Sequence, residues 1–157
     1  MNQTSPEKAS PIVRRAVQKD IPQILEMIKA LAEFHDDTPK ICQSALERDA
    51  LGETPWIYLL VAEVGDKLVG YTALCPLVQL HNGTRGIDMH HLFVSQNMRA
   101  RGVGRALVQG SLATARNLFC EYMMVGTDDK NTAAQEFYLN SGFRRNKKVS
   151  PRFICSV

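Results

Sequence analysis

The chain has 157 residues, 45% of them hydrophobic, and a formal net charge of +3, which predicts one globular domain with a packed core and excludes a disordered chain. The longest unbroken apolar run covers residues 56–62, far short of the ~20 residues that cross a membrane, and residues 1–11 are too polar for the core of a secretory signal. We therefore expect no membrane partner and no secretory signal, and the small net charge argues against nucleic acid as a partner.

The first helix has a clear start signal. Asp20 can cap its first turn, Pro22 is tolerated there, and Gln23 can reach back to the cap. Apolar side chains then recur at helical spacing from Ile21 to Ala32. This spacing predicts that one face of the helix packs on a core.

Turn and strand signals divide the rest of the chain. Gly65-Asp66 and Asn82-Gly83 are typical of turns between strands, and Gly142 is typical of a helix end. We expect a flexible tail over residues 1–11 and one domain over residues 12–157. Within the domain, the predicted strands cover residues 12–17, 56–64, 67–75, 86–94, 120–126 and 152–157. The predicted helices cover residues 21–32, 44–51, 104–118 and 131–140, and residues 34–43 are a predicted loop. This order of strands and helices favours an α/β fold.

The loop over residues 95–105 runs from a predicted strand into a predicted helix. Such a loop directs several backbone N–H groups and the positive end of the helix dipole toward one place, and its glycines let a phosphate approach closely. A Gly-Lys-Ser/Thr ending is absent and the dinucleotide fingerprint is incomplete. The remaining pattern, Arg-x-x-Gly-x-Gly at Arg99, Gly102 and Gly104, resembles the pyrophosphate loop of the GCN5-related N-acetyltransferases, which bind acetyl-coenzyme A (acetyl-CoA).

A second segment, residues 131–143, resembles the Asn-x-x-Ala…Tyr…Gly-Phe element of the same family. Ala134, Phe137 and Tyr138 share one face of its predicted helix. Residues 13–31, 59–64 and 70–71 are similar to the diamine (spermidine/spermine) acetyltransferase branch. The resemblance implies a single-domain fold with a mixed, strongly twisted sheet and helices on both sides, and a homodimer. The widely separated cysteines favour a cytoplasmic protein.

The resemblance also implies transfer of an acetyl group from acetyl-CoA to a primary amine of a small molecule, by direct attack through a tetrahedral intermediate. The pantetheine arm is expected to pair like an extra strand with residues 92–94, where a backbone N–H polarises the thioester carbonyl. Asn131 is expected to contact the arm, and Tyr138 to protonate the departing thiolate. The coenzyme-binding residues expected on this basis are Leu92, Phe93, Val94, Arg99, Ala100, Arg101, Gly102, Val103, Gly104, Arg105, Asn131, Ala134 and Tyr138.

The amine acceptor must lose a proton, because alkylamines titrate near pH ~10. The branch has an acidic pair where this chain has His90 and His91, and an acidic residue where this chain has His35. His90 is the first candidate for the general base, since imidazole titrates near neutrality. Simple strand alternation predicts that His90 and His91 point to opposite faces, so that at most one faces the cleft. Glu33 or His35, acting through water, is the alternative, and the acceptor-binding residues expected are Glu33, His35, His90 and His91.

No metal is expected. A zinc site from His35, His81, His90 and His91 lacks a supporting spacing, and this chemistry needs no metal. The four cysteines, Cys42, Cys75, Cys120 and Cys155, are widely separated, which favours reduced and mostly buried thiols over disulfides or a catalytic cysteine.

Two other functions fit the same motifs. A peptide N-terminus or a lysine side chain could be the acceptor, in which case an acidic groove with an open end is expected. A non-catalytic module could bind the acyl-coenzyme and leave it untransferred, although Tyr138 favours an enzyme.

Overall fold

The structure is a computed structural model that describes residues 10–146 and 153–156. The chain forms two compact units, Met1–Gly126 and Thr127–Val157. Most of the predicted N-terminal tail lies outside the described residues, and the first strand begins at Ile12. No helix in the described ranges is long and apolar enough to cross a membrane.

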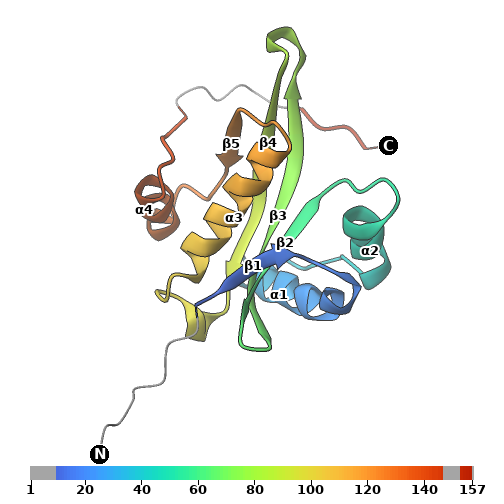
Figure 1. Cartoon of the computed structure of the whole chain (residues 1–157), viewed down its shortest axis with the longest axis vertical. Helices are drawn as coiled ribbons and strands as arrows, with labels where there is room; N and C mark the ends of the chain where they lie inside the picture. Colours follow the sequence, from blue (N-terminus) through green and yellow to red (C-terminus); the bar gives the residue numbers. More distant parts are fainter. Residues whose placement is uncertain (1–9, 147–152, 157) are drawn as a thin grey trace, which may run out of the picture. The chain divides into compact units, whose positions relative to one another are not determined.

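The first unit is built on a five-stranded sheet with the strand order β1-β2-β3-β4-β5. Its elements are β1 (Ile12–Arg15), η1 (Gln18–Asp20), α1 (Ile21–Phe34), α2 (Gln43–Leu51), β2 (Tyr58–Val64), β3 (Lys67–Gln79), η2 (Leu80–Asn82), β4 (Thr84–Val94), η3 (Gln96–Met98), α3 (Val103–Asn117) and β5 (Tyr122–Val125). Neighbouring strands from β1 to β4 are antiparallel, whereas β4 and β5 are parallel (Figure 1). The predicted mixed sheet is therefore confirmed.

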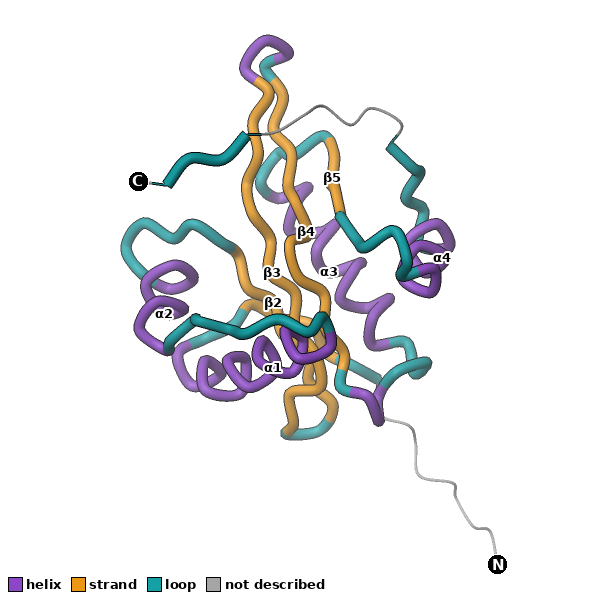
Figure 2. Tube along the Cα trace, turned by 180° about the vertical axis from the view of Figure 1, so that it is seen from behind, coloured by secondary structure: helices purple, strands orange, loops and turns teal. Residues whose placement is uncertain are grey.

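Helices cover both faces of this sheet. One hydrophobic core joins Ile24 of α1 and Leu46 of α2 to Tyr71 of β3. A second core joins Leu107 of α3 to Val69 of β3. In Figure 1, α3 lies in front of the strands, and in Figure 2, seen from behind, it lies beyond them. The apolar faces of α1 and α3 thus close the sheet from opposite sides, as predicted.

The entry into α1 differs from the prediction. The carboxylate of Asp20 does not cap α1 but accepts the backbone N–H of Val17 at 2.8 Å, within the preceding turn. It also accepts two hydrogen bonds from the Arg14 guanidinium, at 2.6 and 3.0 Å, and Arg14 donates to Glu63 at 2.9 Å. Because Arg14 lies on β1 and Glu63 on β2, this network ties the two strands to the start of α1.

The β3–β4 hairpin is longer than predicted. The predicted strand ends at Cys75, whereas β3 continues to Gln79, and Pro76 pairs with Ile87 inside the hairpin. The ladder with β2 ends at the Tyr58–Leu74 pair. Among the described residues, no strand pairs with the β2-facing edge of β3 at Pro76, so its missing N–H costs no ladder hydrogen bond there. The predicted turn at Asn82-Gly83 is confirmed, with Gly83 in the left-handed region at φ +64°.

The second unit contains α4 (Thr132–Asn140). The final strand predicted over residues 152–157 is wrong for residues 153–156, which form neither strand nor helix, while positions 152 and 157 lie outside the described residues. Phe153 and Ile154 are fully exposed. Strand-forming residues need a neighbouring strand and a packed face to form a strand, and local sequence does not supply these.

Candidate active site

The edge of β4 is the first part of the site. The β5 ladder pairs only with residues 86–89 of β4, and it ends at the Met89–Val125 pair. Within the described part of the first unit, residues 91–94 therefore pair with β3 alone. A strand edge of this kind can accept an extended chain of amide groups by main-chain hydrogen bonding. This edge includes Leu92, Phe93 and Val94, the residues predicted to pair with pantetheine.

A β-bulge in β4 brings two predicted site residues together. His91 pairs with Ala73 and Met89 pairs with Leu74, so His90 is an extra residue in the ladder. The prediction that His90 and His91 point to opposite faces is therefore wrong, because the bulge interrupts the alternation. Their imidazole rings are stacked, with centroids 4.6 Å apart and an interplanar angle of 13°.

His91 is the more buried member of this histidine pair. Its Nδ1 lies 2.9 Å from the hydroxyl oxygen of Tyr71, and the buried Thr72 hydroxyl donates to its backbone carbonyl at 2.8 Å. Burial lowers the pKa of His91 to about 4, with smaller contributions from the neighbouring charges of His90 and His35. Burial also raises the pKa of the Tyr71 hydroxyl. Both groups are therefore neutral at pH 7.

The loop between β4 and α3 has the geometry expected for binding an anion. Gly102 precedes the first residue of α3 and adopts φ +85°, and Ala100 adopts φ +56°. The first intrahelical hydrogen bond runs from the Ala106 N–H to the Gly102 carbonyl, which leaves the N–H groups of residues 103–105 at the open helix end. Of these residues, Val103 has a buried side chain, so only its backbone can serve a ligand.

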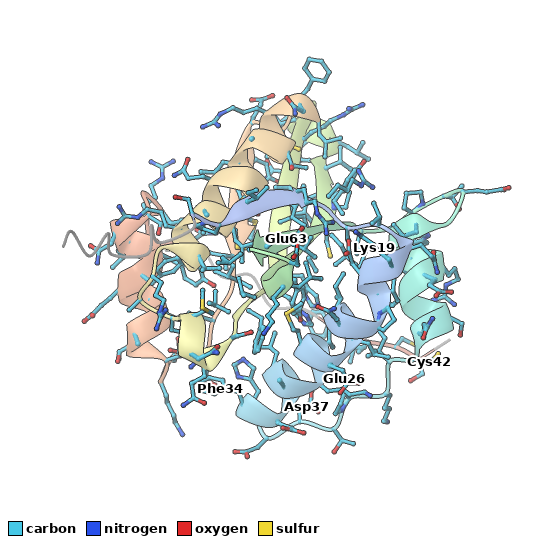
Figure 3. The ribbon with its side chains drawn as sticks, turned by 60° about the horizontal axis from the view of Figure 1, so that its bottom comes forward. Lys19, Glu26, Phe34, Asp37, Cys42 and Glu63 are labelled. Carbon is cyan, nitrogen blue, oxygen red and sulfur yellow. The ribbon has the colours of Figure 1, made fainter. Side chains whose placement is uncertain are left out.

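The arginines of this loop are not equivalent. All three are exposed, but within the described ranges neither Arg101 nor Arg105 makes a side-chain hydrogen bond or a ring contact. Arg99 instead donates from Nε to the Val94 carbonyl at 3.1 Å, and its guanidinium carbon lies 5.7 Å from the centroid of the Phe34 ring. Arg99 thus links the end of β4 to the end of α1, besides adding charge to the loop. Phe34, which the sequence analysis did not single out, is 61% exposed at the C-terminal end of α1 (Figure 3).

The end of α1 carries the other predicted acceptor-binding residues. Glu33 and His35 are both exposed, and the His35 ring lies edge-on to Phe34 with centroids 5.3 Å apart. Asp36 adopts φ +54° as the chain leaves the helix, and Asp37 follows it (Figure 3). His35 contributes to the lowered pKa of His91. The end of α1 therefore acts electrostatically on the histidine pair.

Asn131 and Ala134 form the start of α4 in the second unit. The side-chain oxygen of Asn131 accepts the Ala134 N–H at 3.1 Å, as an N-cap residue does. The Asn-x-x-Ala spacing is therefore a helix-capping motif. The carbonyl side of the Asn131 amide is committed to the cap, and its NH₂ group is the part of this side chain suited to hydrogen bonding with a ligand.

Tyr138 lies in the last turn of α4, and the helix end holds its ring. Gly142 adopts φ +93°, and the N–H groups of Phe143 and Gly142 bond to the carbonyls of Tyr138 and Leu139. This is the Schellman arrangement, which commonly brings the residue after the glycine back onto the helix. Phe143 accordingly meets Tyr138 edge-on, with ring centroids 5.7 Å apart. Burial raises the pKa of Tyr138, so its hydroxyl keeps its proton at neutral pH.

Among the described residues, the cysteines form no disulfide and the potential metal ligands form no metal site. The thiols of Cys42, Cys75, Cys120 and Cys155 are all free. Cys42 and Cys155 are exposed and the other two half-buried, so the expectation of mostly buried thiols is wrong. Among the described residues, no group of three or more His, Cys, Asp or Glu side chains is arranged to hold a metal ion.

The comparisons with known proteins identify the family. The sequence profile of the acetyltransferase (GNAT) family matches residues 24–143, which extend over both compact units. The chain belongs to the GNAT family. It is therefore an N-acetyltransferase, and acetyl-CoA is the acetyl donor that GNAT enzymes use.

Two curated GNAT relatives are similar over most of this chain. The thialysine N-epsilon-acetyltransferase of Sus scrofa is 30% identical over 146 residues, which cover 87% of this chain and 85% of that protein. The spermidine/spermine N(1)-acetyltransferase-like protein 1 of Homo sapiens is 26% identical over 139 residues, which cover 83% of this chain and 20% of that protein. The predicted place of this GNAT enzyme near the polyamine acetyltransferases is confirmed.

Solved structures share the GNAT fold. A probable acetyltransferase matches with a TM-score of 0.81 at 20% identity, over 93% of this chain and 98% of that one. An aminoglycoside acetyltransferase from an uncultured soil metagenomic sample, in complex with sisomicin, matches with a TM-score of 0.77 at 17% identity, over 94% of this chain and 97% of that one. At such identities the likeness concerns the fold, and it confirms the predicted α/β architecture.

Proposed function

We propose that this GNAT enzyme transfers the acetyl group of acetyl-CoA to a primary amine of a small molecule, by direct attack through a tetrahedral intermediate. The observation that carries the proposal is the bulge in β4. It places a pair of imidazoles directly beside the strand edge proposed to bind the thioester arm. Direct attack by an amine requires a base that accepts the amine proton and a backbone edge that binds and polarises the thioester carbonyl.

The acetyl donor is held at two places in this proposal. The edge over residues 92–94 pairs with the amides of pantetheine, and a backbone N–H of the edge polarises the thioester carbonyl. The loop over residues 99–105 binds the pyrophosphate through the N–H groups at the start of α3, with the charges of Arg101 and Arg105 nearby. The left-handed backbone at Ala100 and Gly102 supports this role, because it turns the chain sharply before the helix.

Proton transfers through two side chains complete the reaction. His90 accepts a proton from the amine, and its exposed ring can pass that proton to water. The amine nitrogen bonds to the thioester carbon, the C–S bond breaks, and Tyr138 donates a proton to the sulfur. The second proton of the nitrogen leaves to water, and water returns a proton to Tyr138. The raised pKa of Tyr138 supports this role, because the general acid must arrive protonated.

The choice of a small acceptor rests on the relatives. One relative is named for thialysine and another for spermidine and spermine, and a structural neighbour holds sisomicin. We propose an acceptor of this size, bound between the histidine pair and the exposed end of α1, where Glu33 and His35 lie. Exposed carboxylates there attract a cationic amine.

The test is free-thiol release from acetyl-CoA against spermidine, putrescine, thialysine, agmatine, an aminoglycoside and a lysine-bearing peptide, with mass spectrometry of each product. We expect turnover with at least one small amine and slower turnover of the peptide. Preferred acetylation of the peptide would contradict the small-molecule assignment. Tight binding of acetyl-CoA without turnover of any acceptor would favour the binding-module alternative.

We further propose that the enzyme works as a cytoplasmic homodimer. The free thiols support a reducing compartment. Val78 and Leu80 on the β3–β4 hairpin are 61% and 84% exposed, and a hollow of about 280 Å³ lined by Pro76, Val78 and Leu118 lies at the same part of the sheet. Exposed apolar side chains that gather in this way favour contact with another chain.

A further inference from the structure

The two stacked histidines lie in unequal surroundings. His90 is exposed, whereas His91 is half-buried and lies against Tyr71, which is fully buried. The Tyr71 and His91 rings meet edge-on with centroids 6.0 Å apart, and the hydroxyl oxygen of Tyr71 lies 2.9 Å from Nδ1 of His91. Each imidazole therefore has a different set of groups available for proton transfer.

The Tyr71 contact determines which nitrogen of His91 carries the proton. Both groups are neutral at pH 7, since burial raises the pKa of Tyr71 and lowers that of His91. A phenol hydroxyl is a stronger donor than a neutral imidazole N–H, and an imidazole nitrogen is a stronger acceptor than a phenol oxygen. Tyr71 therefore donates to Nδ1, and the single ring proton of His91 lies on Nε2. With Nδ1 occupied and Nε2 protonated, neither nitrogen of His91 can take a proton from an amine.

We propose that Tyr71 and His91 form a positioning pair, in which Tyr71 holds His91 in the Nε2–H tautomer and the His91 ring holds the stacked His90 ring as the proton acceptor. This inference rests on the proposed function and assigns distinct roles to the two histidines. The amine proton moves to a ring nitrogen of His90, and His91 acts only as a fixed ring and an N–H donor. His35 at the end of α1 is the other titratable group that acts on His91.

Histidine side-chain NMR of ¹⁵N-labelled protein tests the tautomer without any substrate. We expect His91 to be neutral at pH 7 with its proton on Nε2. In Tyr71→Phe, the Nδ1–H and Nε2–H tautomers should both be populated. Tyr122→Phe, which removes a hydroxyl from a half-buried tyrosine of β5, is the control and should leave the His91 signals unchanged. An Nδ1–H tautomer in the wild type, or an unaltered tautomer in Tyr71→Phe, would overturn the proposal.

Kinetics with the best amine from the panel test the division of roles. His90→Ala should lower kcat by about 10²–10⁴-fold and remove the acidic limb of the kcat/KM profile. Tyr71→Phe should lower kcat by about 10–100-fold, because the base is misplaced, and should keep the acidic limb and the KM for acetyl-CoA. If His90→Ala keeps the acidic limb, His90 is not the base and the assignment fails. Absence of turnover in the wild type would instead refute the proposed function, and the NMR result would still decide the tautomer.

Discussion

Tyr138 is held by its own helix end. The left-handed Gly142 turns Phe143 back against the Tyr138 ring, so removal of the hydroxyl leaves the packing intact. We expect Tyr138→Phe to lower kcat by about 10²–10⁴-fold while acetyl-CoA affinity is nearly unchanged. Steady-state kinetics and calorimetric titration measure the two quantities, with Tyr122→Phe as the control. An unchanged kcat would remove Tyr138 from the mechanism.

The buried carboxylate of Asp20 is a second residue with a measurable effect. Its pKa is lowered chiefly by the Arg14 hydrogen bonds. A lowered pKa in the folded state means that the stabilisation is complete above the unfolded value, ~3.9, and is lost as the pH falls through the folded pKa. Asp20→Asn should therefore lower the free energy of unfolding by about 1–3 kcal/mol at pH 7, and the deficit should shrink in acid.

Urea denaturation of wild type and Asp20→Asn at pH 7 and at pH 3 measures this effect. Asp49→Asn is the control, because Asp49 pairs with the exposed Arg48 and solvent-exposed pairs contribute little to stability. A deficit for Asp20→Asn that is equal at both pH values would show that the Arg14 pairing is not its cause.

Single residues of the site were predictable where their roles are local. The helix end at Gly142 was predicted from short-range geometry, and the structure confirms it. The cap formed by Asn131 was not predicted, although its Asn-x-x-Ala spacing is equally local. The stacking of His90 on His91 was not predictable, because it depends on a bulge in the pairing of β4 with β3. The Tyr71 partner of His91 was missed for the same reason, since a register between strands cannot be seen in one strand.

Among the elements, the loop before α3 gives the most specific prediction. Gly102 and Gly65 both adopt positive φ, at +85° and +62°, and a Cβ added at either position would meet no atom within 4 Å. Valine at either position should cost about 1–2 kcal/mol of backbone strain. Only Gly102→Val should also weaken acetyl-CoA binding, by at least about tenfold, because it displaces the N–H groups at the start of α3. Equal affinities for Gly102→Val and Gly65→Val, measured by calorimetry, would mean that this loop does not bind the coenzyme.

Element order was largely predictable from turn signals and hydrophobic spacing, and the exceptions have physical causes. The Asp20 carboxylate accepts the Val17 N–H in the turn before α1 and does not cap the helix, because Arg14 from β1 also binds this carboxylate. β3 passes through Pro76, because no strand in the described part of the chain pairs with its β2-facing edge there. The strand predicted at the C-terminus is not formed by residues 153–156. The exception at Pro76 depends on strand pairing that the local sequence does not show.

For the whole molecule, the homodimer proposal makes a direct prediction. Light scattering coupled to size exclusion should give twice the chain mass for the wild type. Val78→Asp/Leu80→Asp should shift the protein toward the monomer, because charges replace exposed apolar contacts on the β3–β4 hairpin. Ile12→Asp, at a 66% exposed position on β1, is the control and should stay dimeric. A wild type of single chain mass would refute the dimer.

Intact-protein mass spectrometry during one reaction tests directly whether the acetyl group passes straight from acetyl-CoA to the amine. The enzyme is incubated with acetyl-CoA alone, and the best amine of the panel is then added while free CoA and acetylated amine are quantified. Direct attack predicts an unmodified protein mass throughout, negligible CoA before the amine is added, and equimolar CoA and N-acetylated amine afterwards. An acetylated protein that forms without amine and is consumed when amine arrives would contradict direct transfer from the β4 edge.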